Sequence, residues 1–106
     1  MERYVWRNYI KEGMEKEYIR RHNEGFWPEK TELFHECGNH NYSIWLVENE
    51  VIGYMECEKG VEYALACQQA SEVKSRWDEY MKDILVRKND PDTGKPYPIH
   101  QVFLHP

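Results

Sequence analysis

The segment over residues 41–58 constrains the fold more than any other part of the chain. Residues 41–47 place Tyr42, Ile44 and Leu46 on one face by alternation, and residues 51–58 form a second strand-like run after the polar tripeptide Glu48, Asn49 and Glu50. A period of two residues is typical of a β-strand. Two strands joined by so short a connection pair side by side in opposite directions. The segment therefore predicts a β-hairpin and, with it, an antiparallel sheet.

The rest of the chain supplies two more strands and the helices that must cover the sheet. The patterns predict a strand over residues 3–10, helical segments over residues 14–24, 28–37 and 60–84, and a last strand over residues 99–104. Residues 89–98 hold three prolines and a glycine, which predicts a loop. In chain order the elements are strand, helix, strand, strand, helix, strand. This order predicts one α+β domain, in a ferredoxin-like arrangement with helices on one face of the antiparallel sheet.

Apolar side chains occur on both faces of the predicted strands. On the third strand, Val51 and Met55 lie on one face, while Ile52 and Tyr54 lie on the other. An antiparallel sheet that leaves one face to water keeps that face polar. The side of the sheet away from the helices therefore needs a cover, and a second copy of the chain is the simplest one. We expect a homodimer.

Charge and hydropathy narrow the range of partners. The chain has 106 residues and a net charge of −5. A surface that binds nucleic acid needs clustered basic residues, and the pair Arg20 and Arg21 is too short for one. No apolar run approaches the length that crosses a bilayer, and the amino-terminal residues are polar. These patterns predict a cytoplasmic protein that binds neither nucleic acid nor membrane.

The cysteines and histidines show no spacing that is typical of a metal site. Cys37, Cys57 and Cys67 are odd in number, widely spaced and without a Cys-x-x-Cys pair. We expect three reduced, mostly buried thiols, and neither a disulfide nor a zinc ion. The histidines lack a His-x-x-x-His spacing. No metal or other cofactor is expected.

The stretch from Tyr18 to Glu29 holds the candidate for chemistry. Tyr18 and His22 lie four residues apart and therefore share one face of the predicted helix. Gly25 can end that helix, and Pro28 suits the first turn of the next one. An imidazole titrates near neutral pH, which makes His22 a candidate for proton transfer. By pattern alone, a histidine beside a tyrosine on a charged helix is more often a surface pair.

Several runs of residues, spread over almost the whole chain, carry a resemblance to a known family. They are Tyr18, Arg20-Arg21-His22-Asn23, Trp27-Pro28-Glu29, His40-Asn41-Tyr42-Ser43-Ile44, Arg76-Trp77 with Tyr80-Met81, and Gln101-Val102-Phe103-Leu104-His105-Pro106. These runs resemble the L-rhamnose mutarotases, small proteins that interconvert sugar anomers. The resemblance implies a dimer whose two sheets form an α+β barrel. It also implies that His22 donates a proton and that Tyr18, Tyr42 and Trp77 contact the sugar.

Interconverting two anomers requires only the exchange of protons. A base removes the proton of the anomeric hydroxyl while an acid protonates the ring oxygen, and the ring opens and closes again on its other face. Phenols donate and accept hydrogen bonds with sugar hydroxyls, and an indole stacks on the apolar face of a pyranose. The predicted function is therefore a sugar mutarotase that acts on L-rhamnose or a related 6-deoxy hexose through His22.

The sequence departs from the family pattern beside the proposed sugar pocket. The family has two tryptophans in a row where this chain has Trp77 and Asp78, so we expect Asp78 to bind a sugar hydroxyl and to change the preferred sugar. Other interpretations stay open. Core packing alone would account for Tyr42 and Trp77, and Arg20 and Arg21 can be solvated or paired with nearby glutamates. The alternative functions are a non-catalytic, dimeric sugar-binding module and, from the fold alone, a small oxygenase.

Overall fold

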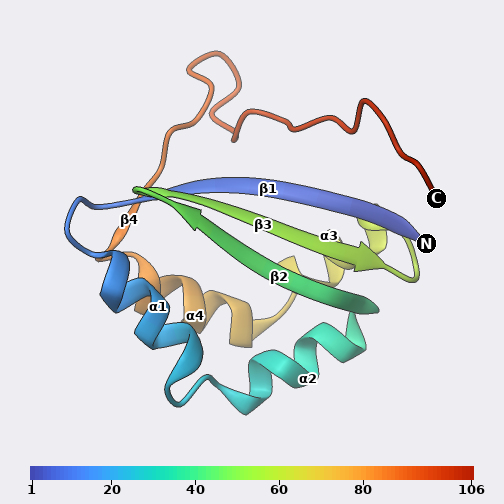
Figure 1. Ribbon diagram of the computed structural model, residues 1–106. Coiled ribbons are helices and arrows are strands. Elements are labelled where there is room, and N and C mark those ends of the chain that lie inside the picture. The colour runs from blue at the N-terminus through green and yellow to red at the C-terminus, as the bar shows by residue number, and fades with distance from the viewer.

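The computed structural model describes residues 1–106 as one curled antiparallel sheet with four helices packed on one face (Figure 1). The strands are β1 (Glu2–Ile10), β2 (Asn39–Val47), β3 (Glu50–Cys57) and β4 (Leu85–Val86). The helices are α1 (Glu15–Asn23), α2 (Pro28–Glu36), α3 (Val61–Gln69) and α4 (Glu72–Met81). None of these helices is long and apolar enough to cross a membrane. The strand order β2-β3-β1-β4 confirms the α+β class and the ferredoxin-like arrangement.

The predicted hairpin is present, with β2 at one edge of the sheet and β3 inside it. β2 and β3 pair antiparallel over almost their whole length, and β1 pairs with the other side of β3. The register of β2 shifts between His40 and Ser43, and Asn41 adopts a positive φ of 48° there. A bulge of this kind redirects the side chains beside it. In this chain the bulge lies next to Tyr42, one of the predicted site residues.

Local signals in the sequence place the helix ends. Acidic side chains lie in the first turn of α1 and basic ones in its last turn, as the helix dipole favours. Gly25 follows with a φ of 66°, a left-handed conformation that glycine adopts without strain. Pro28 occupies the first turn of α2. The predicted helical segment over residues 60–84 is two helices, because Ser71 caps α4 by accepting a hydrogen bond of 3.1 Å from the Val73 amide.

The core lies between the sheet and the helices. Its largest cluster joins Ile10 and Val51 of the sheet to Trp77 and Met81 of α4. Ile84, just after α4, is completely buried in the same cluster. The apolar stripe predicted along this helix therefore faces the sheet. Packing of one helical stripe on one sheet face is what gives an α+β domain of this size its core.

The prediction of a last strand over residues 99–104 is wrong. The fourth strand is Leu85–Val86, which pairs with Tyr9 and Ile10 at the end of β1. Residues 99–104 pair with no other strand, and Val102 is 94% exposed. Alternating side chains suit a strand, but a strand also needs a neighbouring edge to bond with. After β4 the chain leaves the sheet on the side away from the helices and does not return to it (Figure 1).

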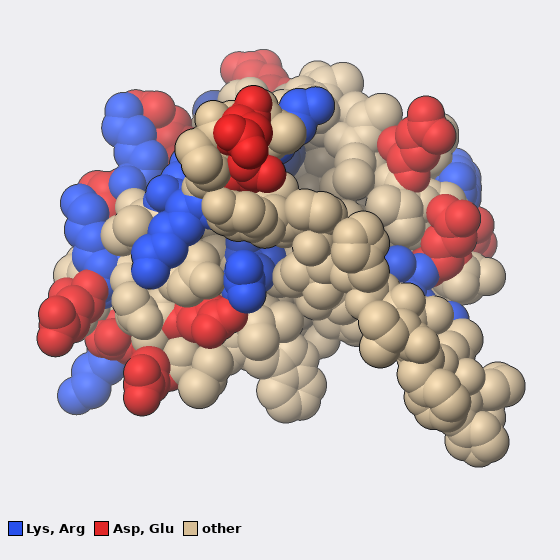
Figure 2. Space-filling view, turned by 90° about the horizontal axis from the view of Figure 1, so that it is seen from above, with Lys and Arg blue, Asp and Glu red and all other residues tan.

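The outer face of the sheet, which we define as the face away from the helices, carries apolar side chains. Ile52 and Tyr54 of β3 are only partly buried on this face, and Trp45 of β2 is 67% exposed. Figure 2 views the molecule from this side and shows the uncharged C-terminal segment running across it. The two-sided apolar character predicted for the strands is therefore present in the folded chain.

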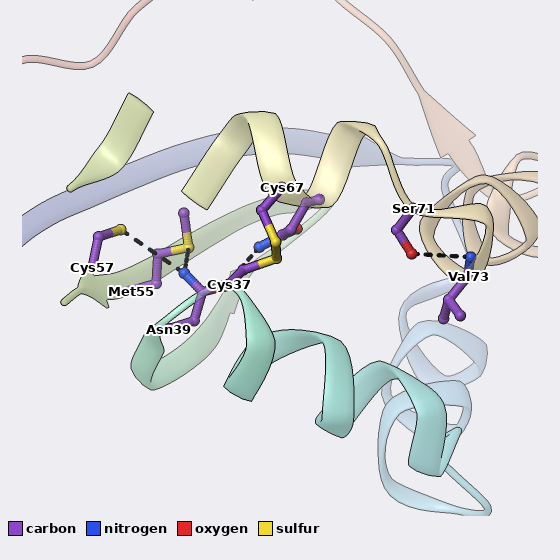
Figure 3. The surroundings of a disulfide bond; sticks show 8 residues. Cys37, Asn39, Met55, Cys57, Cys67, Ser71 and Val73 are labelled. Carbon is purple, nitrogen blue, oxygen red and sulfur yellow. Dashed lines mark hydrogen bonds between the residues drawn. A yellow bond between two sulfur atoms is a disulfide. The ribbon is translucent and has the colours of Figure 1, made fainter. Parts of the chain in front are cut away.

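The expectation of three reduced thiols is wrong for two of them. Cys37 and Cys67 form a disulfide, and only Cys57 is free and buried (Figure 3). The Cα atoms of the bonded pair lie 5.6 Å apart, because the fold brings the end of α2 beside α3. Their separation of 30 residues in the chain carries no sign of this proximity. Asn39 lies beside the disulfide and donates a hydrogen bond of 3.0 Å to the sulfur of Met55 (Figure 3).

Candidate active site

A cavity of about 840 Å³ lies between the helices and the sheet and has the size of a small-molecule site. All five residues predicted for the site line it: Tyr18, His22, Tyr42, Trp77 and Asp78. They come from α1, β2 and α4, which are far apart in the sequence. The cavity also extends past β1 to residues 97–100 of the C-terminal segment. No three His, Cys, Asp or Glu side chains lie close enough together to share a metal ion.

His22 lies in the last turn of α1 with its ring among aromatic side chains. Its ring centroid is 4.4 Å from that of Tyr18, 5.9 Å from that of Phe26 and 5.2 Å from that of Trp77. The Nδ1 atom lies 2.9 Å from the carbonyl oxygen of Tyr18. Because a carbonyl oxygen only accepts, Nδ1 must be the donor. In the neutral ring the lone pair therefore lies on Nε2.

Burial decides the protonation state of this imidazole. Loss of solvent lowers the pKa of His22 below its ordinary value of 6.5, and the nearby Lys30 charge lowers it further, whereas the bond to the Tyr18 carbonyl acts the other way. The ring is therefore neutral at pH 7. A neutral imidazole with a free lone pair on Nε2 can accept a proton from a bound hydroxyl and return it later.

An ion-pair network holds α1 against the end of α4. Arg21 donates to Oδ1 of Asp83 at 2.9 Å and to the carbonyl oxygen of Tyr80 at 2.9 Å. Glu17 accepts hydrogen bonds from both Arg20 and Arg21. Of the two interpretations that the sequence left open for these arginines, pairing with a nearby glutamate is confirmed. The network fixes the helical turn that carries the imidazole.

Tyr42 is held from two sides, next to the bulge in β2. The indole Nε1 of Trp6 donates a hydrogen bond of 3.0 Å to its hydroxyl, and its ring stacks on Phe34 with centroids 4.6 Å apart. Burial raises the pKa of Tyr42 to about 12, although the bond from Trp6 opposes this, and burial likewise raises the pKa of Tyr18. Both phenols therefore keep their protons at neutral pH and can donate to a ligand.

Trp77 belongs to the core and to the cavity wall at the same time. It is 8% exposed and lies in the main core cluster. Its ring also meets those of His22 and Trp27 edge to face, with centroid distances of 5.2 Å in both cases. The two interpretations of this residue, core packing and site wall, are therefore compatible.

Asp78 lines the cavity beside Trp77, but it is already paired. The Nζ atom of Lys74 lies 2.5 Å from Oδ2 of Asp78, one helical turn away on α4. Both side chains belong to the cavity wall. The carboxylate thus keeps one oxygen for a ligand, and its predicted contact with a sugar hydroxyl stays a prediction.

The sequence did not predict several other residues of the cavity wall, among them Trp6, Lys30 and Phe34. The alternation of β1 places Trp6 on the same face as Tyr4, which was a usable signal. Phe34 lies on the inner side of α2, one turn before Cys37. Lys30 offered no signal, because lysine on a helix normally points to water, yet it is only 6% exposed.

Comparison with known proteins gives one consistent result. Residues 3–105 match the family model described as L-rhamnose mutarotase. A protein named L-rhamnose mutarotase from Lachnoclostridium phytofermentans is 37% identical over 96 residues, which cover 89% of this chain and 88% of that protein. One of the same name from Jannaschia sp. (strain CCS1) is 31% identical over 106 residues and 100% of both chains. A crystal structure of L-rhamnose mutarotase from Formosa agariphila shares the fold, with a TM-score of 0.77 and 24% identity over 100% of both chains.

Proposed function

The chain belongs to the L-rhamnose mutarotase family, and we propose that it interconverts the α and β anomers of L-rhamnose or of a related 6-deoxy hexose. The observation that supports this most directly is the cavity itself. It brings an imidazole that is neutral at pH 7 together with two protonated phenols and an indole. These are the groups that a sugar needs for stacking, for hydrogen bonding and for the exchange of a proton.

In the proposed mechanism the protein moves protons and holds the sugar in place. Nε2 of His22 takes the proton of the anomeric hydroxyl, and a phenol of the cavity supplies a proton to the ring oxygen. The ring opens, the aldehyde turns over, and the reverse transfers close the ring on its other face. Trp77 offers the surface on which the pyranose stacks. The reaction needs no covalent bond between sugar and protein, because ring opening breaks only the bond between the anomeric carbon and the ring oxygen.

Saturation-transfer NMR on an equilibrium mixture of L-rhamnose anomers tests this function. Irradiation of the anomeric proton of one anomer should reduce the signal of the other when the protein is added at micromolar concentration. The exchange rate should exceed the spontaneous rate in proportion to the protein concentration. Exchange that stays at the spontaneous rate, although L-rhamnose binds, would identify the protein as the non-catalytic sugar-binding module instead. The pairing of Asp78 with Lys74 inside the cavity is the observation that keeps this second candidate in view.

The proposal includes a homodimer formed through the outer face of the sheet. This face holds Ile52 and Tyr54, only partly buried, together with the exposed Trp45. The C-terminal segment adds Phe103, which is 79% exposed. Apolar side chains of this kind, gathered on one face, mark a surface that another chain covers. Multi-angle light scattering at micromolar concentration should report twice the chain mass of 12.9 kDa, and a stable mass near that of one chain would contradict the dimer.

A further inference from the structure

Lys30 is a buried cation in the wall of the cavity. It lies on α2, is only 6% exposed, and lines the same space as His22 and Asp78. Its Nζ atom is 5.1 Å from the centre of the Phe34 ring and 5.7 Å from that of the Trp77 ring. Lysine is almost never buried unless its charge is compensated. A compensating group in the cavity would therefore stabilise this ammonium.

The protein itself supplies little of that compensation. No Asp or Glu oxygen lies within 4.0 Å of the Nζ atom of Lys30, which forms no hydrogen bond with another side chain and is open to the cavity. The carboxylate that acts on it, Asp78, is bound by Lys74. Burial lowers the pKa of Lys30 to about 8, Asp78 opposes this shift and Lys74 adds to it. The side chain is still mainly charged at pH 7, and the aromatic rings stabilise that charge only in part.

The charges around the cavity have the same sign as Lys30. Four cationic side chains line it against a single carboxylate, Asp78, although the chain as a whole carries a net charge of −5. The cations are Lys30, Lys74, Arg87 and Lys95, whereas Arg7 at the rim lies on the outer face of the sheet and pairs with Glu50. Lys30 is the one of these that is buried. A cavity lined mainly by one sign of charge attracts a ligand of the opposite sign.

We propose that Lys30 is a substrate-binding residue that extends the range of this mutarotase to sugars carrying a carboxylate, the hexuronates. The inference rests on the proposed function, because it names a substrate class for the same cavity. The ammonium donates a charge-assisted hydrogen bond to the carboxylate at carbon 6, where L-rhamnose carries a methyl group. One ammonium matches the single charge of a carboxylate. A phosphate, with more charge and more acceptor oxygens, calls for additional donors such as an arginine fork, which the inner wall lacks.

Three sugars with the same ring test the inference, because they differ only at carbon 6: L-rhamnose, L-mannose and L-mannuronate. NMR exchange measurements would give kcat/KM for each. We expect the wild-type protein to prefer L-mannuronate to L-mannose by about 10-fold or more. Lys30→Met keeps the length of the side chain and removes its charge. It should lower the ratio of kcat/KM for L-mannuronate to that for L-rhamnose by roughly 10- to 100-fold, and Lys30→Arg should retain part of that ratio.

The matched control is Lys82→Met, which removes the same charge from an exposed position of the chain that does not line the cavity. It should leave the ratio unchanged. Lys30→Met replaces a charged side chain that is only 6% exposed with an apolar one of similar length, so it should fold about as stably as the wild type, and thermal unfolding checks this. If the wild type exchanges L-rhamnose but not L-mannuronate, or if Lys30→Met lowers both equally, the inference is overturned while the proposed function stands. If exchange of all three sugars stays at the spontaneous rate, both fail.

Discussion

Replacing His22 with alanine is expected to slow anomer exchange by about 10²- to 10⁴-fold, the range that general acid–base catalysis normally contributes. His22 is the one imidazole in the inner part of the cavity, and its Nδ1 is committed to the Tyr18 carbonyl, so that Nε2 remains for the sugar. The phenols cannot take over as bases, because burial raises the pKa of both Tyr18 and Tyr42. Water replaces the lost group only in part. Saturation-transfer NMR on L-rhamnose measures the loss directly.

Two further variants separate the chemistry of His22 from its packing. His22→Gln keeps a polar side chain of similar size but cannot exchange the proton, so it should be nearly as slow as the alanine variant. His35→Ala removes an exposed imidazole from α2 and should change neither the rate nor the stability. Circular dichroism shows whether each variant stays folded. Exchange by His22→Ala within a factor of about two of the wild type would assign the proton transfer to another group of the cavity.

The pH dependence of the anomer-exchange rate provides a second test of the role of His22. Burial lowers the pKa of His22, so the neutral ring that accepts a proton predominates at pH 7. As the pH falls, the ring takes up a proton and can no longer act as the base. The rate should therefore fall on the acid side, with a midpoint below the ordinary histidine value of about 6.5. This acid limb should disappear in His22→Gln.

Patterns that are local in the sequence predicted most of the fold. The hairpin of β2 and β3 follows from two strand-like runs with a short polar connection, and the break between α1 and α2 follows from Gly25 and Pro28. The last strand was misplaced because alternation describes side chains and not the edge to which a strand bonds. The disulfide between Cys37 and Cys67 was missed for a related reason, since only the packing of α2 beside α3 brings these cysteines together.

The contacts of the candidate site also fall into two groups, those that are local in the sequence and those between distant segments. Tyr18 and His22 are four residues apart, so helical spacing alone predicts that they meet, and their ring centroids do lie 4.4 Å apart. The pair Trp6 and Tyr42 is separated by 36 residues and depends on the sheet register. Lys30 is a harder case, because nothing in its neighbours along the chain distinguishes a buried lysine from a solvated one. Contacts between distant segments depend on tertiary packing, so local patterns in a single sequence do not predict them.

Adding a single methyl group at Gly53 is expected to disturb both the fold and the site. Gly53 lies opposite Trp6 on the neighbouring strand, and a Cβ atom built there would overlap the indole ring of Trp6. That indole donates the hydrogen bond that fixes the hydroxyl of Tyr42. Gly53→Ala must therefore displace the ring that anchors one wall of the cavity. We expect a loss of about 1–3 kcal/mol in the free energy of unfolding, as for other overpacked cores, measured by urea titration. Because a misplacement of about 1 Å can cost roughly 10²-fold in rate, kcat/KM for L-rhamnose should fall by about 10- to 100-fold.

The Trp6→Ala background tests whether the indole is the cause. Gly53 does not have a positive φ, so an alanine fits its backbone conformation. Where the indole no longer blocks the space, Gly53→Ala should be neutral or should stabilise by about 0.4–1 kcal/mol, because it restricts the unfolded chain. The effect of one methyl group should thus change sign between the two backgrounds, and a double-mutant cycle measures that coupling. If Gly53→Ala alone unfolds at the wild-type urea concentration and exchanges anomers at the wild-type rate, the indole has room to move. Tyr42 would then be held by its stacking on Phe34 and not by Trp6.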